Sequence, residues 1–351
     1  MSFLQKPKVS HSGLPRNELG LSIRDYEGSM STLCAGCGHD SVTAALIQAI
    51  WELNLPPHTI VKMSGIGCSS KTPAYFVEAA HGINAVHGRM PSIATGANAA
   101  NRNLHYIGIS GDGDSLSIGL GQFAHVLRRN VRMLYLIENN GVYGLTKGQF
   151  SASADLGSKA KKGEVNRQPP IDPVTLALEL GGSFIARGFS GDKDQLVPLI
   201  KAGLMHDGFA LLDVLSPCVT FNDHEGSTKS YAHTRHFDHP AAQADFVPRK
   251  IPIQAVYAGG EAIPVALHDG STVILKKVAK DYNPVNREEA YQYIQEHRAR
   301  GQIVTGLLYI NEDQAEFHTL NGTASGALRD LPYADLCPGA AVLEEIQQRY
   351  R

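Results

Sequence analysis

Five cysteines are the residues of this chain whose types and spacing most clearly suggest chemistry. Cys34 and Cys37 form a Cys-x-x-Cys pair in the glycine-rich stretch CAGCGHD, whereas Cys68, Cys218 and Cys337 are single. A disulfide, a zinc ion, a redox dithiol and an iron–sulfur cluster are the candidates for the pair. Few cysteines in a long chain argue against a disulfide framework and favour metal binding or catalysis. Four thiolates suit a zinc ion as well as a cluster. Zinc ribbons usually have two Cys-x-x-Cys pairs, whereas this chain has one pair and single cysteines, so the cysteines alone favour the two groups about equally.

A second pattern places oxygen ligands in two glycine-rich turns. In GDGDSLSIG, Asp112 lies between Gly111 and Gly113, and Asn140 of ENNGVYG follows 28 positions later. Magnesium takes about six oxygens in octahedral geometry and usually shares them with a phosphate group. We expect a carboxylate oxygen from Asp112, an amide oxygen from Asn140 and the backbone carbonyl of Val142. The glycines let backbone amides approach the phosphate oxygens closely.

The surrounding elements predict an α/β protein. Strands are expected at residues 59–63, 104–109 and 209–215 and in VRMLYLIENN, with helices at 40–53, in SIGLGQFAHVLRRN and in NREEAYQYIQEHRARG, the last capped by Asn286 and ending near Gly301. PVALHDGSTVILKK reads as a hairpin around His268–Asp269–Gly270. This alternation indicates a mostly parallel sheet with helices on both faces and a C-terminal α+β extension. The chemistry-bearing residues follow strand ends, so they should converge at one edge of the sheet.

Three regions are expected: an irregular segment at 1–30, a cofactor-binding α/β domain at 31–240, and an extension at 241–351 for packing or subunit assembly. The net charge of −2 gives no electrostatic case for nucleic acid or an anionic membrane. No signal peptide and no apolar run of membrane-spanning length is recognised, so a cytoplasmic protein is expected. Charged residues make up only 19% of the chain, which hints at a surface covered by partner subunits.

GDG followed by an Asn pair resembles the thiamine-diphosphate signature. Beside such a site, a [4Fe–4S] cluster held by Cys34, Cys37, Cys68 and Cys218 is favoured over zinc, because oxidation of the thiamine adduct needs an electron exit. Cys337 is interpreted as a buried, inert cysteine. In a fixed order over roughly residues 25–320, CAGCGHD, GIGCSSKTP, HGRMPSIATGAN, GDGDSLSIG, ENNGVYGLTKGQ and SPC resemble the β subunits of 2-oxoacid:ferredoxin oxidoreductases.

The resemblance implies thiamine diphosphate, Mg²⁺ and one [4Fe–4S] cluster as cofactors. It also implies oxidative decarboxylation of a 2-oxo acid to an acyl-CoA, with electrons leaving to ferredoxin, reversibly in some organisms. An α subunit would complete the thiamine site in a dimer of heterodimers. That subunit would supply the glutamate that activates thiamine, so the isolated chain is expected to be inactive.

Further site residues follow from the same resemblance. His87 and Arg89 match a stretch near substrate or thiamine, and Asp114, Gly144 and Leu145 belong to the cofactor loops. His39 and Asp40 are expected to cap the following helix.

Substrate choice depends on one lysine. Lys71 and Leu145 match positions lining the 2-oxo acid pocket. A lysine there favours 2-oxoglutarate, whose second carboxylate would pair with it, over pyruvate. The alternatives are a pyruvate or broad-specificity enzyme, a non-redox thiamine decarboxylase or carboligase with structural zinc, and a non-catalytic scaffold.

Overall fold

The computed structural model describes residues 11–158, 163–220, 253–266 and 272–351. Within these residues, nine strands form one sheet in the order β2-β1-β3-β4-β8-β7-β11-β10-β9, and β5 and β6 form a separate pair. The strands are β1 (Ile60–Ser64), β2 (His81–Asn84), β3 (His105–Gly111), β4 (Met133–Asn139), β5 (Val142–Tyr143), β6 (Gln149–Phe150), β7 (Phe184–Phe189), β8 (Phe209–Leu215), β9 (Ala262–Ala266), β10 (Thr272–Lys277) and β11 (Gln302–Ile310).

The sheet is mostly parallel, as predicted. All neighbours from β2 through β7 in the sheet order pair in parallel. β11 then pairs antiparallel with β7, β10 pairs parallel with β11, and β9 pairs antiparallel with β10. Residues 262–310 therefore extend the same sheet that carries the glycine-rich loops.

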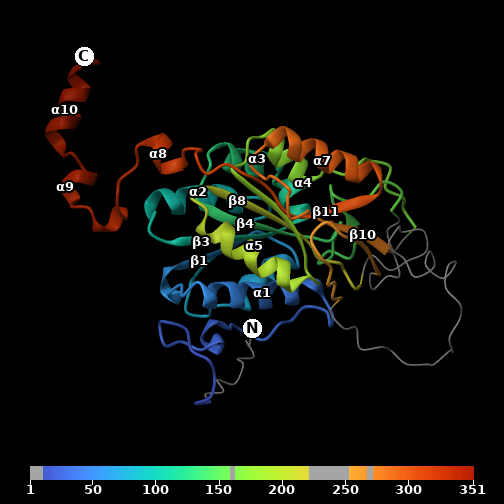
Figure 1. The fold of residues 1–351 in the computed structure, drawn as a ribbon. Coiled ribbons are helices and arrows are strands. Elements are labelled where there is room, and N and C mark those ends of the chain that lie inside the picture. The colour runs from blue at the N-terminus through green and yellow to red at the C-terminus, as the bar shows by residue number, and fades with distance from the viewer. Residues whose placement is uncertain (1–10, 159–162, 221–252, 267–271) are drawn as a thin grey trace, which may run out of the picture.

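Helices cover both faces of the sheet (Figure 1). One face is covered by α1 (Gly38–Glu52) and α5 (Lys193–Met205), and the other by α2 (Met90–Ala100), α3 (Leu120–Arg128), α4 (Pro173–Glu179) and α7 (Arg287–Ala299). Short elements complete the chain: η1 (Ile23–Tyr26), η2 (Pro57–Thr59), η3 (Ser69–Ala74), a π-helical turn η4 (Gly113–Ile118), α8 (Phe317–Asn321), η5 (Leu328–Asp330), α9 (Tyr333–Leu336) and α10 (Ala340–Gln348). This two-sided covering explains why β1, β3, β4, β7 and β8 are buried along most of their length, whereas the edge strand β2 is exposed.

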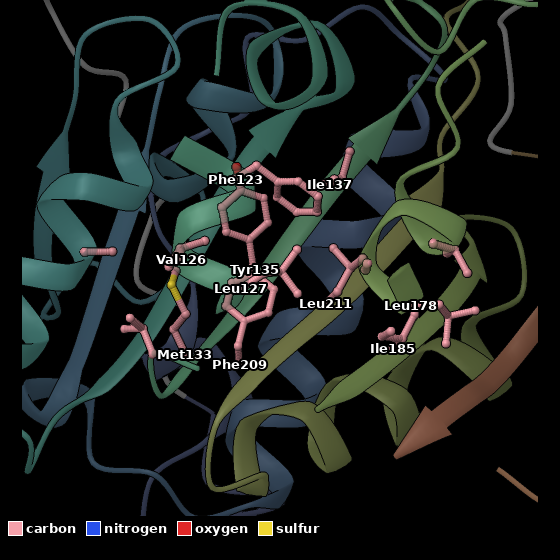
Figure 2. Packing of buried hydrophobic residues seen from close by; sticks show 14 of the residues in the cluster. Phe123, Val126, Leu127, Met133, Tyr135, Ile137, Leu178, Ile185, Phe209 and Leu211 are labelled. Carbon is pink, nitrogen blue, oxygen red and sulfur yellow. The ribbon is translucent and has the colours of Figure 1, made fainter. Parts of the chain in front are cut away.

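An aromatic cluster anchors α3 to the sheet (Figure 2). Phe123 of α3 lies 5.5 Å from Tyr135 of β4 and 6.4 Å from Phe209 of β8, measured between ring centroids. All three are almost fully buried. Tilted and edge-on aromatic pairs add about 0.5–1.5 kcal/mol each beyond the burial of their area. The cluster thus fixes α3, which begins just after the GDG loop.

Several local predictions are confirmed. β8 has the predicted bounds, and α7 begins after Asn286, whose side chain accepts hydrogen bonds from the amides of Glu288 and Glu289. β9 and β10 form the predicted antiparallel pair, although the predicted turn at His268–Asp269–Gly270 lies outside the described residues.

None of the helices in the described ranges combines the length and apolar character needed to cross a membrane.

The C-terminal arm, residues 331–351, extends away from the sheet (Figure 1). Neither α9 nor α10 has a buried residue, and Tyr333 and Tyr350 are 78% and 87% exposed. Cys337 lies in this arm and is exposed, so the interpretation of Cys337 as a buried cysteine is wrong. Its position on the arm keeps it apart from the other four cysteines.

Candidate active site

A pocket opens at the carboxyl ends of β1, β3 and β4, where the sequence predicted the chemistry to converge. Its empty volume is about 470 Å³, with open solvent at the mouth included. Its lining residues are His39, Ile66, Gly67, Cys68, Ser69, His87, Gly111, Asp112, Gly113, Asp114, Glu138, Asn140, Val142, Tyr143, Gly144, Leu145 and Thr146. Most of the predicted cofactor residues are therefore brought together by the fold.

Asp112 is almost fully buried, and its two carboxylate oxygens differ in their partners. Oδ2 accepts hydrogen bonds from the Gly141 amide at 3.0 Å and from the hydroxyls of Ser151 and Ser153. Oδ1 receives a long hydrogen bond of 3.5 Å from the Asn140 amide. Burial raises the pKa of Asp112 despite the hydrogen bonds from Ser151 and Ser153, which lower it. Oδ1 is the less engaged oxygen, so the carboxylate fits the role of a magnesium ligand.

The turn after β4 holds Asn140 beside Asp112. Oδ1 of Asn140 accepts a hydrogen bond from the Val142 amide at 3.1 Å, and an amide oxygen has a second lone pair for a metal. Gly141 has φ = +75°, which a residue with a Cβ rarely adopts. The Tyr143 hydroxyl donates to the Gly113 carbonyl at 2.9 Å and ties this turn to the GDG loop. The two predicted halves of the magnesium site are thus joined directly.

Asp114 links the GDG loop to the HGR stretch. Its carboxylate accepts hydrogen bonds from the Gly88 amide at 2.8 Å and from the Ser110 hydroxyl at 2.8 Å. Nδ1 of His87 lies against the Asp114 carboxylate but has no aligned hydrogen-bond partner in the described residues. Asp114 therefore joins the two loops and lies against His87 at the pocket.

Glu138 and His39 form a buried polar floor, whereas the sequence analysis expected His39 only as a helix cap. The Thr72 hydroxyl donates to both carboxylate oxygens of Glu138, at 3.1 and 3.0 Å, and His39 Nδ1 lies 3.7 Å from that carboxylate. Burial raises the pKa of Glu138 well above its ordinary value and lowers that of His39 to about 4. Both shifts favour the neutral forms of these two neighbouring side chains, and each has its own hydrogen-bond partner, Thr72 for Glu138 and Ser216 for His39.

The prediction that His39 and Asp40 cap α1 is not supported by the observed helix start. Cys37 is the N-cap residue and makes no side-chain capping bond. His39 instead reaches across to the residue after β8, where its Nδ1 lies 2.6 Å from the Ser216 hydroxyl. The helix start thus joins one cysteine loop to the strand that precedes Cys218.

The four predicted cluster cysteines come from three loops that meet beside the pocket. Burial raises the pKa of Cys37, and the thiol of Cys218 raises it further. Burial also raises the pKa of Cys68; the thiols of Cys218 and Cys34 add to this, whereas Lys71 opposes it. The thiols therefore lie within electrostatic reach of one another at this edge of the sheet.

The arrangement of the thiols bears on which metal group would fit. In the described part of the chain, no three His, Cys, Asp or Glu side chains close on one point that could hold a single ion. A zinc ion needs sulfurs within about 4 Å of one another, since each Zn–S bond is about 2.3 Å. The thiolates of a four-iron cluster bind separate irons and stand further apart. Four thiols are a donor set that suits a [4Fe–4S] cluster as well as a zinc ion.

Arg89 and Lys71 do not line the pocket. The Arg89 guanidinium reaches the Ile118 carbonyl at 3.4 Å, and Lys71 lies in η3, three residues after Cys68. Leu145 lines the pocket and is 49% exposed at its mouth. The structure thus brings Leu145 to the predicted place and leaves Lys71 beside the cysteine loop.

Some of the missed residues had local signals. Glu138 is a charged residue at the end of an otherwise apolar strand, which is a recognisable sign of a buried functional acid. His39 follows the Cys-x-x-Cys pair directly. Ser151 and Ser153 had no local signal, because they lie 39 and 41 residues after the Asp112 that they contact.

Comparisons with known proteins agree with this geometry. Residues 65–214 match the model of the thiamine pyrophosphate enzyme C-terminal TPP binding domain. A 2-oxoglutarate synthase subunit KorB from Methanocaldococcus jannaschii is 36% identical over 189 residues, covering 54% of this chain and 69% of that protein. The chain belongs to the family of 2-oxoacid:ferredoxin oxidoreductase β subunits.

Other members of this β-subunit family are matched over a smaller share of their length. The 2-oxoacid:ferredoxin oxidoreductase subunit beta of Saccharolobus solfataricus is 44% identical over 203 residues, 58% of this chain and 66% of that protein. The 2-oxoglutarate oxidoreductase subunit KorB of Mycobacterium tuberculosis is 36% identical over 217 residues, 61% of this chain and 58% of that protein. The matched stretch thus covers less than two thirds of these two relatives.

A solved structure extends the likeness beyond the matched stretch. It is the 2-oxoglutarate:ferredoxin oxidoreductase from Magnetococcus marinus with 2-oxoglutarate, coenzyme A and succinyl-CoA bound. The alignment has a TM-score of 0.69 and 26% identity, and it covers 89% of this chain and 92% of that one. The shared fold therefore includes most of the strands and helices described above.

Proposed function

We propose that this chain is the β subunit of an enzyme that converts 2-oxoglutarate and coenzyme A to succinyl-CoA and CO₂ and delivers two electrons to ferredoxin. The observation that carries the proposal is the position of Cys68. It lines the pocket of Asp112 and Asn140, and its thiol interacts with those of Cys34 and Cys218. A cofactor pocket adjoining a set of thiols suits an oxidising enzyme better than a simple decarboxylase.

The cofactors would be held by residues already described. Bound thiamine diphosphate would stabilise the carbanion left by decarboxylation, and a [4Fe–4S] cluster would accept electrons. Asp112, Asn140 and the Val142 carbonyl would bind Mg²⁺, and the amides around Gly113 and Gly144 would approach the phosphates. The cluster ligands would be Cys34, Cys37, Cys68 and Cys218. His87, positioned by Asp114, would face the reacting end of the pocket.

The partner would be an α subunit that closes the pocket and contributes the activating glutamate. Apolar side chains stand exposed at the pocket or next to its lining residues: Leu145 is 49% exposed and Ile66 37%, and Val86, which precedes the lining residue His87, is 70% exposed. Clustered exposed apolar residues are typical of protein interfaces. We infer a dimer of heterodimers, with residues 241–351 serving packing and assembly.

Iron analysis of paired cysteine variants tests the cofactor assignment. In the complex purified with its α subunit, Cys68→Ser should lose most of its iron, because a hydroxyl is a poor substitute for a thiolate ligand. Cys337→Ser is the matched control and should keep full iron content, since Cys337 lies on the exposed arm. Equal iron loss in both variants would show that the ligand set is wrong. A colourless wild type with stoichiometric zinc would refute the redox function.

The substrate assignment rests on Lys71, which does not line the pocket itself but lies three residues after the lining residue Cys68; its ammonium would reach from there to the distal carboxylate of 2-oxoglutarate. Lys71→Ile should reduce the ratio of kcat/KM for 2-oxoglutarate to that for pyruvate by about tenfold to a hundredfold, the effect of a lost charge-assisted hydrogen bond. Lys193→Ile, an exposed position on α5, is the control for the same substitution.

Steady-state kinetics of the assembled complex give a clear decision. A wild type that prefers pyruvate, or an unchanged ratio in Lys71→Ile, would contradict the carboxylate pairing. Equal loss of both substrates would assign Lys71 to coenzyme A or to the common chemistry instead.

A further inference from the structure

The four thiols have a pocket side and a solvent side. Cys68 lines the cofactor pocket, Cys37 is buried and Cys218 is half-buried. Cys34 is exposed within the described residues. A group held by these thiols would therefore meet the pocket at Cys68 and the surface at Cys34.

One side-chain hydroxyl is directed at the solvent-side thiol. Thr220 Oγ1 donates a hydrogen bond to Cys34 Sγ at 3.3 Å, across 186 positions of sequence. Thr220 lies two residues after Cys218, just beyond β8, so this bond joins two of the three cysteine loops. A hydroxyl can orient its hydrogen toward a sulfur acceptor, and a thiolate accepts more strongly than a thiol because it is charged.

We propose that Thr220 sets the reduction potential of the cluster by donating this hydrogen bond to the Cys34 thiolate. The inference rests on the proposed function, because it requires the [4Fe–4S] cluster. Reduction adds one electron, and part of its negative charge spreads to the ligating sulfurs. A donor at a sulfur stabilises the reduced form more than the oxidised form and so raises the potential. Thr220 is thus a positioning residue that acts through Cys34.

Removing the hydroxyl of Thr220 or of Thr32, the second of which lies two residues before Cys34 in the sequence, makes the test specific. Thr220→Val removes the donor with little change in shape, and Thr220→Ser keeps the hydroxyl. Thr32→Val is the matched control, because Thr32 lies two residues before Cys34 but its hydroxyl lies 2.8 Å from that of Tyr75. The readout is the midpoint potential of the cluster, followed by its spectrum during redox titration of the complex, together with iron content.

Thr220→Val should have full iron content and a more negative potential. At the wild-type midpoint, its ratio of oxidised to reduced cluster should rise roughly threefold to tenfold, the size of an ordinary net hydrogen bond. Tenfold corresponds to about 59 mV for a one-electron couple. Thr220→Ser and Thr32→Val should titrate like the wild type.

Each contrary result has a distinct meaning. A wild-type potential in Thr220→Val with full iron overturns the inference and leaves the proposed function intact. Loss of iron in Thr220→Val also overturns it, because Thr220 would then be a structural tie between the cysteine loops. A wild type that contains no iron refutes the proposed function itself.

Discussion

Two regions of this protein bury carboxylates in opposite ways. At the pocket, Asp112 is surrounded by hydroxyl and amide donors, and in the described residues it forms no ion pair with a cationic side chain. Beside β7 and β8, the Arg187 guanidinium lies between Asp172 and Asp213, donating to Asp213 at 2.7 Å. The second cluster contains its own cation and the first does not.

The pKa values follow this difference at Asp172 but not at Asp213. Burial raises the pKa of Asp112, and its hydrogen bonds do not compensate fully. Burial alone would raise the pKa of Asp172 too, but the charge of Arg187 and the Val174 amide outweigh it and lower the pKa. At Asp213, which is more deeply buried, burial outweighs the charge of Arg187 and the pKa is raised. A buried acid without a cation of its own is poised to bind one from solution. The comparison supports the proposal that Asp112 binds a cation, and it assigns the Arg187 cluster to the scaffold.

Removing the Asp112 charge should have the largest effect of all, on binding but not on folding. Asp112→Asn should weaken Mg²⁺-dependent binding of thiamine diphosphate by at least about a hundredfold, because a charged ligand is lost. The free energy of unfolding of the cofactor-free protein should not fall, since an uncompensated buried charge is removed. Calorimetry of the complex and denaturant titration measure the two effects. Retained diphosphate affinity would refute the magnesium assignment.

Removing the Arg187 charge should lower the stability of the fold rather than weaken cofactor binding directly. Arg187→Met leaves two buried carboxylates without a cation and should lower the free energy of unfolding by about 3–5 kcal/mol. Urea titration of the variant against the wild type measures this difference. Arg187→Lys keeps the charge but loses the guanidinium that contacts both carboxylates, so its free energy of unfolding should lie between those of Arg187→Met and the wild type. A loss below about 1 kcal/mol in Arg187→Met would remove the basis of the comparison.

Lys62 extends the comparison to a buried cation and should give the smallest effect. Its ammonium donates to the carbonyls of Phe76 and Val77 at 2.7 and 2.8 Å, and burial lowers its pKa from 10.5 to about 8. Between pH 8 and 10.5 the unfolded chain binds more protons at this site than the folded chain. Stability relative to Lys62→Met should therefore rise with pH across that window, by at most about 3 kcal/mol. Urea titrations of the wild type and Lys62→Met at the two ends of this pH window measure the change. A stability difference that stays constant with pH would contradict the lowered pKa of Lys62.

The parts that could be predicted depend on short stretches. The GDG and Asn-Asn-Gly turns, the strands that precede them and the Asn286 cap follow from local spacing, apolar runs and turn residues. Because parallel strands share one carboxyl edge, the meeting of Asp112, Asn140 and Cys68 was also predictable. The joining of β11 to β7 was not, because strand order depends on which edge of the sheet remains free.

Side-chain contacts between distant segments lie beyond such patterns. The hydroxyls of Ser151 and Ser153 reach Asp112, His39 reaches Ser216 across 177 positions, and Thr220 reaches Cys34 across 186. Residue types and spacing determine that this chain has oxygen ligands and thiols at strand ends. Packing of the sheet and its helices determines which oxygen of Asp112 stays less engaged and which thiol faces the surface, because both depend on burial that no local stretch encodes.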